Sequence, residues 1–575
     1  MAQIMVKDLT FSYDTVYENI FEHVSFQIDT DWRLGFIGRN GRGKTTFLNL
    51  LMGKYEYQGS ITASVEFDYF PFDVAETDRN TLEVIKDIIA PFREWELKMQ
   101  QCLEEHEREL QLTQGQTNID QRNSKQNNGE QCNSEQNSSK LKAREQEDRI
   151  DREQDSLSPA MLQYGELQEL YQKHDGYIID ELIEKELGKL QVEQSVLDRP
   201  FHTLSFGERT KLMLAAMFLK KNRFLLIDEP TNHLDMEGRD ILADYLQSKK
   251  GFLLVSHDRA FLDKCVDHVL SINRADIEVQ KGNFSSWYQN RERNDQYELE
   301  KNEQLKKEIS ELTESARRTA GWSDQVEASK IGNHSPDRGF IGHKSAKMMK
   351  RAKAIENRKL SSIEEKKGLL KNIEQADPLK MNVLDFYKDR LMEAEDLRLY
   401  YDGREIAGPI NLLLNRGDRI AIRGRNGSGK STLFKLLLGE NISYTGKYLV
   451  ASGLKISYVS QDTSGLTGNL KDYAYYHGLD ETIFKTVLRQ LDFSRNQFEK
   501  NMEEFSAGQK KKVLLARSLT EPAHAFLWDE PLNFIDVLSR IQLEELLLKY
   551  QPTMIFVEHD RIFSEKIMTK EVILT

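Results

Sequence analysis

Two glycine-rich loops, each ending in a lysine and a hydroxyl residue, are the strongest chemical signal in this chain of 575 residues. The first reads Gly38-Arg-Asn-Gly-Arg-Gly43-Lys44-Thr45 and the second Gly424-Arg-Asn-Gly-Ser-Gly429-Lys430-Ser431. Each follows a short apolar stretch and precedes an apolar run with helical spacing, the order of strand, loop and helix that phosphate binding requires. Glycines let backbone NH groups close around phosphate oxygens, and the lysine can reach the outer phosphates. The internal repeat makes a chance match implausible.

Two pairs of carboxylates, Asp228-Glu229 and Asp529-Glu530, each end a short apolar run and precede a proline. We interpret these runs as buried strands. The first carboxylate of each pair suits Mg²⁺, and the second can polarise water. A further apolar run after each pair closes on a histidine, which could sense a γ-phosphate.

A serine begins a helical pattern between each loop and its carboxylates, at Leu204-Ser205-Phe-Gly207-Glu208 and at Phe505-Ser506-Ala-Gly508-Gln509. A serine at a helix start caps the helix and favours bound phosphate there. Taken singly, each of these motifs could be only a turn, a strand end or a core residue. The ordered set, present twice, favours two nucleotide sites.

This ordered set resembles the ATP-binding-cassette (ABC) superfamily, in which the signature of one cassette covers the nucleotide held by the other. The resemblance implies an α/β fold with two tandem ABC-type P-loop ATPase domains, and ATP and Mg²⁺ as ligands. The implied catalytic residues are Glu229, Glu530, His257 and His559. The implied nucleotide-binding residues are Tyr13, Gly38, Asn40, Gly41, Gly43, Lys44, Thr45, Thr46, Ser205, Gly207, Tyr401, Gly424, Asn426, Gly427, Gly429, Lys430, Ser431, Thr432, Ser506 and Gly508. The implied Mg²⁺ ligands are Thr45, Asp228, Ser431, Gln461 and Asp529.

One departure from the family pattern separates the two halves. The second cassette has Tyr458-Val-Ser-Gln461 where the family's Mg²⁺-contacting glutamine belongs, but the first has Tyr69-Phe-Pro-Phe72. Phenylalanine can neither bind a metal nor position water. We therefore expect two unequal ATP sites, both of them active.

Length and hydropathy favour several domains and no membrane segment. A chain of 575 residues exceeds what one hydrophobic core usually supports. We predict a first ATPase domain over 1–285, a helical linker over 286–390 and a second ATPase domain over 391–575, with an arm-like insertion at about 92–200 whose tract 111–139 is of low complexity. No apolar run approaches the roughly 20 residues that span a bilayer, and no signal peptide is apparent, so we expect a cytoplasmic location. The three cysteines show no metal-binding spacing.

The net charge of −13 argues against a nucleic acid partner unless basic residues are segregated from acidic ones. The linker provides that segregation. A charge-laced helix from Ser286 through Ala320 is followed by turn residues from Gly321 to Gly342 and by a second, basic helical pattern. We therefore predict a long α-helical hairpin with a basic face that could follow a phosphate backbone, although such a face could also be a solvated surface. The residues that we expect at rRNA and the drug site are Trp322, Phe340, Lys344, Lys347, Lys350 and Arg351.

Tandem cassettes, an arm and a basic helical linker are similar to the ABC-F family. The pairing of Asp228-Glu-Pro-Thr-Asn-His-Leu-Asp235 with an altered Asp529-Glu-Pro-Leu-Asn-Phe-Ile-Asp536 is more narrowly similar to the Lsa-type and CplR-type antibiotic-resistance proteins, as are the loop Gly38 to Gly43 and the stretch Gly339 to Arg351. The resemblance implies a bacterial 70S ribosome as partner, with contacts to 23S rRNA and P-site tRNA from the tRNA exit site. It also implies protection of the peptidyl-transferase centre from lincosamide, pleuromutilin and streptogramin A antibiotics. We expect no membrane and no DNA partner, and a monomer whose cassettes pair within one chain. A housekeeping ABC-F factor that rescues stalled ribosomes, the ATPase half of a transporter and a DNA-repair cassette protein are the alternatives.

Overall fold

The computed structural model describes residues 3–13, 19–108, 159–232, 234–273, 276–328, 379–401, 403–425 and 427–574, and isolated helical positions between 350 and 361; over 316–328 it describes only the backbone. The chain divides into two compact units. The first combines Met1–Lys281 with Lys380–Thr575, and the second is Gly282–Leu379.

The first cassette is built on a central sheet with the strand order β5-β6-β7-β3-β8-β9. Its strands are β3 (Arg33–Ile37), β5 (Glu66–Phe70), β6 (Arg223–Asp228), β7 (Phe252–Val255), β8 (His268–Asn273) and β9 (Asp276–Lys281). All pairs are parallel except β8 with β9. A second sheet has the order β2-β1-β4, formed by β1 (Gln3–Phe11), β2 (Phe21–Asp29) and β4 (Gln58–Ala63).

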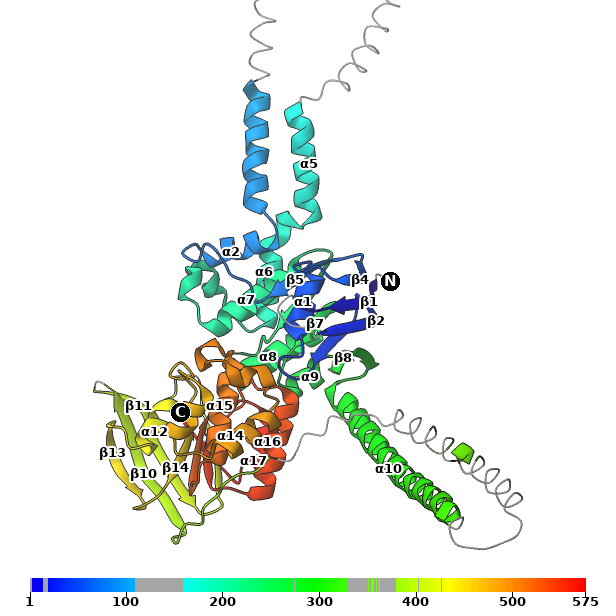
Figure 1. The fold of residues 1–575 in the computed structure, drawn as a ribbon. Helices are drawn as coiled ribbons and strands as arrows, with labels where there is room; N and C mark the ends of the chain where they lie inside the picture. The colour runs from blue at the N-terminus through cyan, green and yellow to red at the C-terminus, as the bar shows by residue number, and fades with distance from the viewer. Residues whose placement is uncertain are drawn as a thin grey trace, which may run out of the picture. The chain divides into compact units, whose positions relative to one another are not determined.

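Helices cover these strands, because parallel strands are apolar on both faces. Residues 224–227 of β6 and all of β7 are buried. The helices of this part of the chain are α1 (Lys44–Leu51), α2 (Thr81–Ile89), α5 (Pro159–Lys173), α6 (Ile179–Lys189), α7 (Phe206–Leu219), α8 (Met236–Gln247) and α9 (Arg259–Cys265), of which α5 belongs to the arm-like insertion and does not cover the sheets (Figure 1).

The second cassette repeats this plan, with a central parallel sheet of order β14-β15-β16-β12-β17 and a second sheet of order β11-β10-β13. The strands are β10 (Arg390–Tyr401), β11 (Arg404–Asn415), β12 (Arg419–Arg423), β13 (Ser443–Val450), β14 (Ile456–Val459), β15 (Ala525–Asp529), β16 (Met554–Val557) and β17 (Lys570–Ile573). The helices are α12 (Lys430–Leu437), α13 (Leu470–Tyr476), α14 (Glu481–Gln490), α15 (Ala507–Thr520), α16 (Val537–Tyr550) and α17 (Arg561–Ile567).

The arm-like insertion contains two helices that lie side by side, one over residues 92–108 and α5 (Figure 1). They share a small core of Cys102, Ala160 and Leu167, and the Tyr171 hydroxyl donates to Glu96 Oε1 at 2.7 Å. The arm-like insertion bends after α5, where Asp175 has a φ of 59° and a short 3-10 turn precedes α6. The low-complexity tract 111–139 lies outside the described residues.

The linker helix α10 spans Phe284–Ala328, 45 residues, or about 67 Å at 1.5 Å per residue. The prediction that this helix ends at Ala320, with a turn at Gly321 and Trp322 in a loop, is wrong, because the helix continues for two further turns. A single glycine costs a helix only about 1 kcal/mol, which the flanking helix-forming residues offset. Residues 329–349 lie outside the described residues, and of the predicted second helix only isolated helical positions between 350 and 361 are described. None of the described helices combines the length and the hydropathy needed to span a bilayer.

Candidate nucleotide sites

The two glycine-rich loops connect a central strand to the first turn of a helix, from β3 to α1 and from β12 to α12. The glycine before each helix has a left-handed backbone, with φ 92° at Gly43 and 85° at Gly429. A Cβ at Gly43 would lie 2.5 Å from the Ile20 side chain, and one at Gly429 would lie 2.8 Å from Ala407 Cβ. Both conformation and space therefore require glycine at these positions.

The two lysines are buried against the backbone of their own loops. Lys44 Nζ donates to Gly38 O at 2.6 Å, and Lys430 Nζ donates to Gly424 O at 2.8 Å. Burial lowers the pKa of both lysines, although nearby carboxylates oppose this effect. Each amino group is thus held at the N-terminus of its helix, where an anion is stabilised.

The carboxylate pairs lie at the ends of β6 and β15, beside the strands that lead to the histidines. Asp228 pairs in register with Val255 of β7, and Asp529 with Val557 of β16. His257 Nε2 lies 3.4 Å from Glu229 Oε1, and the matching distance from His559 to Glu530 is 3.5 Å. The parallel sheet therefore brings together the residues that the sequence analysis grouped.

Both second carboxylates have an unusual backbone. Glu229 has a φ of 49° and Glu530 a φ of 47°. A backbone hydrogen bond to the neighbouring strand fixes each one, from Glu229 N to Val255 O at 2.9 Å and from Glu530 N to Val557 O at 3.0 Å. A left-handed conformation is strained for a residue with a side chain, and such strain clusters at functional sites.

The charges of the two sites differ. Burial, followed by the adjacent Asp228 charge, raises the pKa of Glu229 to about 8. Burial also opposes ionisation of Glu530, yet hydrogen bonds from His559 and Gln461 hold the pKa of Glu530 below its ordinary value. Burial and the Glu530 charge raise the pKa of Asp529 to about 6.

The two signature serines cap helices. Ser205 Oγ accepts from Glu208 N at 3.3 Å at the start of α7, and Ser506 Oγ accepts from Gln509 N at 3.3 Å at the start of α15. In both, the third helical residue bonds back to the serine NH, which completes a capping box.

A cavity of 490 Å³ joins the first loop to the second signature. Its lining includes Asn40, Gly41, Lys44, Thr45, Asp228, Glu229, His257, Ser506, Gly508 and Phe534. A second cavity, of 1140 Å³, joins the second loop to the first signature. Its lining includes Ser205, Gly207, Gly427, Gly429, Lys430, Ser431, Thr432, Gln461, Glu530 and His559. The structure thus groups the residues into two composite sites, each with residues from both cassettes.

The smaller cavity has close contacts across it. Asn40 Nδ2 donates to Phe534 O at 2.7 Å, and a Cβ at Gly508 would lie 2.7 Å from that same oxygen. Arg39 and Arg42 lie 3.7 and 3.8 Å from Asp492 Oδ1. Sequence reasoning missed Phe534 and Asp492. From the sequence, the positive charges of Arg39 and Arg42 indicated only that an acidic residue should lie nearby, without identifying it.

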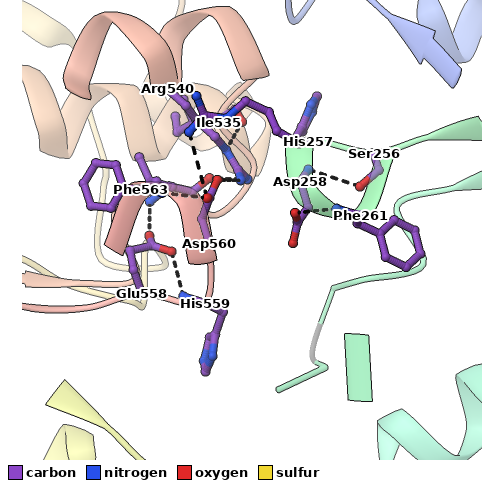
Figure 2. A network of polar contacts seen from close by, with 12 residues as sticks. Ser256, His257, Asp258, Phe261, Ile535, Arg540, Glu558, His559, Asp560 and Phe563 are labelled. Carbon is purple, nitrogen blue, oxygen red and sulfur yellow. Dashed lines mark hydrogen bonds and ion pairs between the residues drawn. The ribbon is translucent and has the colours of Figure 1, made fainter. Parts of the chain in front are cut away.

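A repeated arginine supports the histidine segments. Arg540 on α16 lies 3.2 Å from Asp560, and Arg239 on α8 lies 3.0 Å from Asp258. Figure 2 shows Arg540 directed at Asp560, next to Glu558 and His559. Both arginines stand four residues after the aspartate that caps their helix, Asp235 or Asp536. Aligning the two halves of the sequence would have found this pair.

The predicted adenine contacts are placed unequally. The Tyr13 hydroxyl is 2.9 Å from Thr46 Oγ1, and its ring meets the rings of Phe11 and Tyr55 edge-on. Tyr401, at the end of β10, is 60% exposed. Asn426, Phe340, Lys344, Lys347 and Arg351 lie outside the described residues, as does the side chain of Trp322. Lys350 is exposed.

A protein-family model described as "ABC transporter" matches residues 21–232 and 407–533, together more than half of the chain. The chain belongs to the ABC family. It carries two ABC ATPase domains in tandem, which bind and hydrolyse ATP.

Similar ABC proteins come from several bacteria. YfmM of Bacillus subtilis, described as an uncharacterized ABC transporter ATP-binding protein, is 24% identical over 99% of this chain and 98% of its own length. The ribosome protection protein VmlR of B. subtilis is 28% identical over 66% of this chain and 69% of its own length. The ATP-binding protein Uup of Escherichia coli is 26% identical over 71% of this chain and 61% of its own length.

Among solved structures, the RNase-L inhibitor matches with a TM-score of 0.52 and 16% identity, over 99% of this chain and 87% of its own. The archaeal ribosome recycling factor aABCE1, in a complex with a ribosomal stalk protein, matches with a TM-score of 0.52 and 16% identity, over 98% of this chain and 87% of its own. These likenesses show the tandem ABC fold.

Proposed function

We propose that this protein is an ABC-F-type ATPase that binds the tRNA exit site of the bacterial ribosome. There it protects the peptidyl-transferase centre from lincosamide, pleuromutilin and streptogramin A antibiotics. The observation that carries the proposal is the combination of two composite cavities in one chain with a separate helical unit inserted between the cassettes. The likeness to VmlR, a ribosome protection protein, supports this direction.

The chain's own residues divide the work of ATP hydrolysis. Lys44 and Lys430 bind the outer phosphates at the N-termini of α1 and α12. The signature serines Ser205 and Ser506 each contact the nucleotide that is bound to the loop of the other cassette. Glu229 and Glu530 accept the proton of the attacking water, and the nearby His257 and His559 hold these carboxylates in position.

The donor set at each site fits a divalent cation. Ser431 Oγ lies 3.5 Å from Asp529 Oδ2, and Thr45 lines the same cavity as Asp228. Hydroxyl and carboxylate oxygens are the ligands that Mg²⁺ prefers. We propose Thr45, Asp228, Ser431, Gln461 and Asp529 as its protein ligands. The ion would neutralise negative charge on the phosphate oxygens.

Contacts across the first cavity explain how ATP would set the state of the whole chain. Asn40 of the first loop reaches Phe534 of the second cassette, so a change at one loop acts directly on the other cassette. ATP closes the cassettes and fixes the linker's pose on the ribosome. Hydrolysis opens them for release.

The linker is the part that acts on the ribosome. Phe284 and Trp287 in the first turn of α10 are buried, whereas the rest of the helix is strongly polar. A polar helix about 67 Å long can extend well beyond a cassette. We propose that Lys344, Lys347, Lys350 and Arg351 bind rRNA phosphates, and that Trp322 and Phe340 lie near the drug site and P-site tRNA.

The test is drug protection in a sensitive bacterium. The inhibitory concentrations of a lincosamide and a pleuromutilin are measured with the active protein and with the Glu229→Gln, Glu530→Gln variant at equal expression. We expect a rise with the active protein only. If the inhibitory concentrations do not rise but the protein still co-sediments with ribosomes, the protein is a housekeeping factor and the proposed drug protection is wrong. If the protein does not co-sediment with ribosomes in an ATP-dependent way, the ribosome is not its partner.

A further inference from the structure

A tyrosine contacts the first metal carboxylate. Tyr69, near the end of β5, donates a hydrogen bond from its hydroxyl to Asp228 Oδ2 at 3.0 Å. The two strands are paired in register, with Tyr69 opposite Leu226, so the ring reaches the end of β6 from a fixed position. The side chain is half-buried, and Lys54 Nζ lies 5.7 Å from the centre of its ring.

The second site uses different side chains around its carboxylates. Gln461 Nε2 donates to Glu530 Oε2 at 2.8 Å, and Ser431 Oγ donates to Asp529 Oδ2 at 3.5 Å. Tyr458 is the counterpart of Tyr69, three residues before Gln461. Among the described residues its hydroxyl has no hydrogen-bond partner.

The first site lacks the glutamine contact. Phe72 stands in the glutamine position and has no donor. Glu229 Oε1 is buried and accepts no hydrogen bond among the described residues, and its ion-pair neighbour is His257 Nε2 at 3.4 Å. The one side-chain donor from the β5 segment that reaches the carboxylate pair is therefore the Tyr69 hydroxyl, and it acts on the first carboxylate of the pair.

We propose that Tyr69 is a positioning residue of the first ATP site, which orients the Asp228 carboxylate for the divalent cation where Phe72 has replaced the usual glutamine. The bond to Oδ2 restricts rotation of the Asp228 carboxylate, which would then be held ready to bind a cation. Groups that hold a metal ligand in this way typically contribute 10- to 100-fold to metal affinity. This inference rests on the proposed role of Asp228 as a metal ligand.

The test measures the affinity of the first site for Mn²⁺, not the rate of ATP hydrolysis. Mn²⁺ binding to the full-length protein with a non-hydrolysable ATP analogue is titrated by electron paramagnetic resonance, in an Asp529→Asn background that leaves only the first site to report. We expect Tyr69→Phe to weaken Mn²⁺ binding there by about 10- to 100-fold. Metal-free binding of the analogue and the melting temperature should stay unchanged, which excludes misfolding as the cause.

The matched control is Tyr458→Phe, with Asp228→Asn in place of Asp529→Asn so that the second site reports. We expect its Mn²⁺ affinity to equal that of Asp228→Asn alone. Unchanged or tighter Mn²⁺ binding in Tyr69→Phe would overturn the inference. A separate variant, Asp228→Asn with Asp529→Asn, should abolish the signal. If it binds Mn²⁺ like Asp529→Asn alone, the proposed role of Asp228 fails, independently of Tyr69.

Discussion

Arg259 of the first cassette and Glu544 of the second form a buried ion pair, with side chains only 6% and 3% exposed. Arg259 Nη1 also lies 3.2 Å from the second oxygen of Glu544, so the contact is bidentate. The pair has no mirror image. When the two cassettes are aligned, the position equivalent to Glu544 is Ala243 in the first cassette, and the position equivalent to Arg259 is Arg561 in the second. This buried pair therefore joins the two cassettes on one side only.

Replacement of Arg259 by Met should destabilise the protein by about 3 kcal/mol, because it leaves Glu544 buried without its main partner. Urea unfolding monitored by fluorescence measures this. The matched control is Arg561→Met, whose pair with Glu565 is 60% and 53% exposed and should contribute less than about 0.5 kcal/mol. Equal effects of the two variants would show that burial of the first pair has no energetic consequence.

The two glutamates that we propose as catalytic should contribute unequally to turnover. Gln461 holds Glu530 at 2.8 Å, whereas Phe72 offers no donor to Glu229. We expect Glu530→Gln to lower kcat for ATP by at least about 10²-fold, the usual contribution of a positioned base. Glu229→Gln should lower it by less than about 10-fold. Steady-state phosphate release measures both, and equal losses would contradict the asymmetry.

Much of the site was predictable because its residues are local in sequence and repeated. Gly43, Lys44 and the carboxylate pairs each follow a short apolar strand, and a parallel sheet places such strand ends together whatever the rest of the fold does. The contacts of Asn40 with Phe534 and of Arg42 with Asp492 were not predictable, because they depend on tertiary geometry between distant segments. The continuation of α10 through Gly321 was missed because helix propensity is a sum over neighbours, and one glycine does not decide it.

Glu186 should make stability depend on pH. Burial opposes its ionisation, but hydrogen bonds from Lys189, Lys249 and Tyr245 hold the pKa of Glu186 below its ordinary value. The folded pKa is thus lower than the unfolded one, so the stabilisation is fully present above the unfolded pKa of about 4.3 and is lost as pH falls through the folded value.

Glu186→Gln should therefore lower the free energy of unfolding by about 2 kcal/mol at pH 7, and the difference from the parent should shrink as the pH falls below about 4. Urea unfolding across this range measures it. Glu181→Gln, at an exposed position on the same helix, is the control and should change little. A difference that stays constant with pH would assign the effect to packing instead of charge.

Cys265 should resist alkylation in the folded protein. Its side chain is fully buried, and burial, followed by the Asp258 charge, raises the pKa of its thiol. The reactive thiolate is therefore scarce at pH 8. Cys102 belongs to a small core between two arm helices, which should open locally more often. Iodoacetamide labelling with peptide mass spectrometry should find Cys102 modified before Cys265, and the reverse order would contradict this.

The left-handed backbone at Glu229 and Glu530 has a consequence for engineering. A side chain in this conformation costs roughly 1–2 kcal/mol that glycine would not. Backbone strain is thus retained at the two positions that we propose for the chemistry. Selection for heat resistance alone would favour glycine at both positions, and the resulting protein would keep its nucleotide-binding loops but lose both proposed catalytic carboxylates.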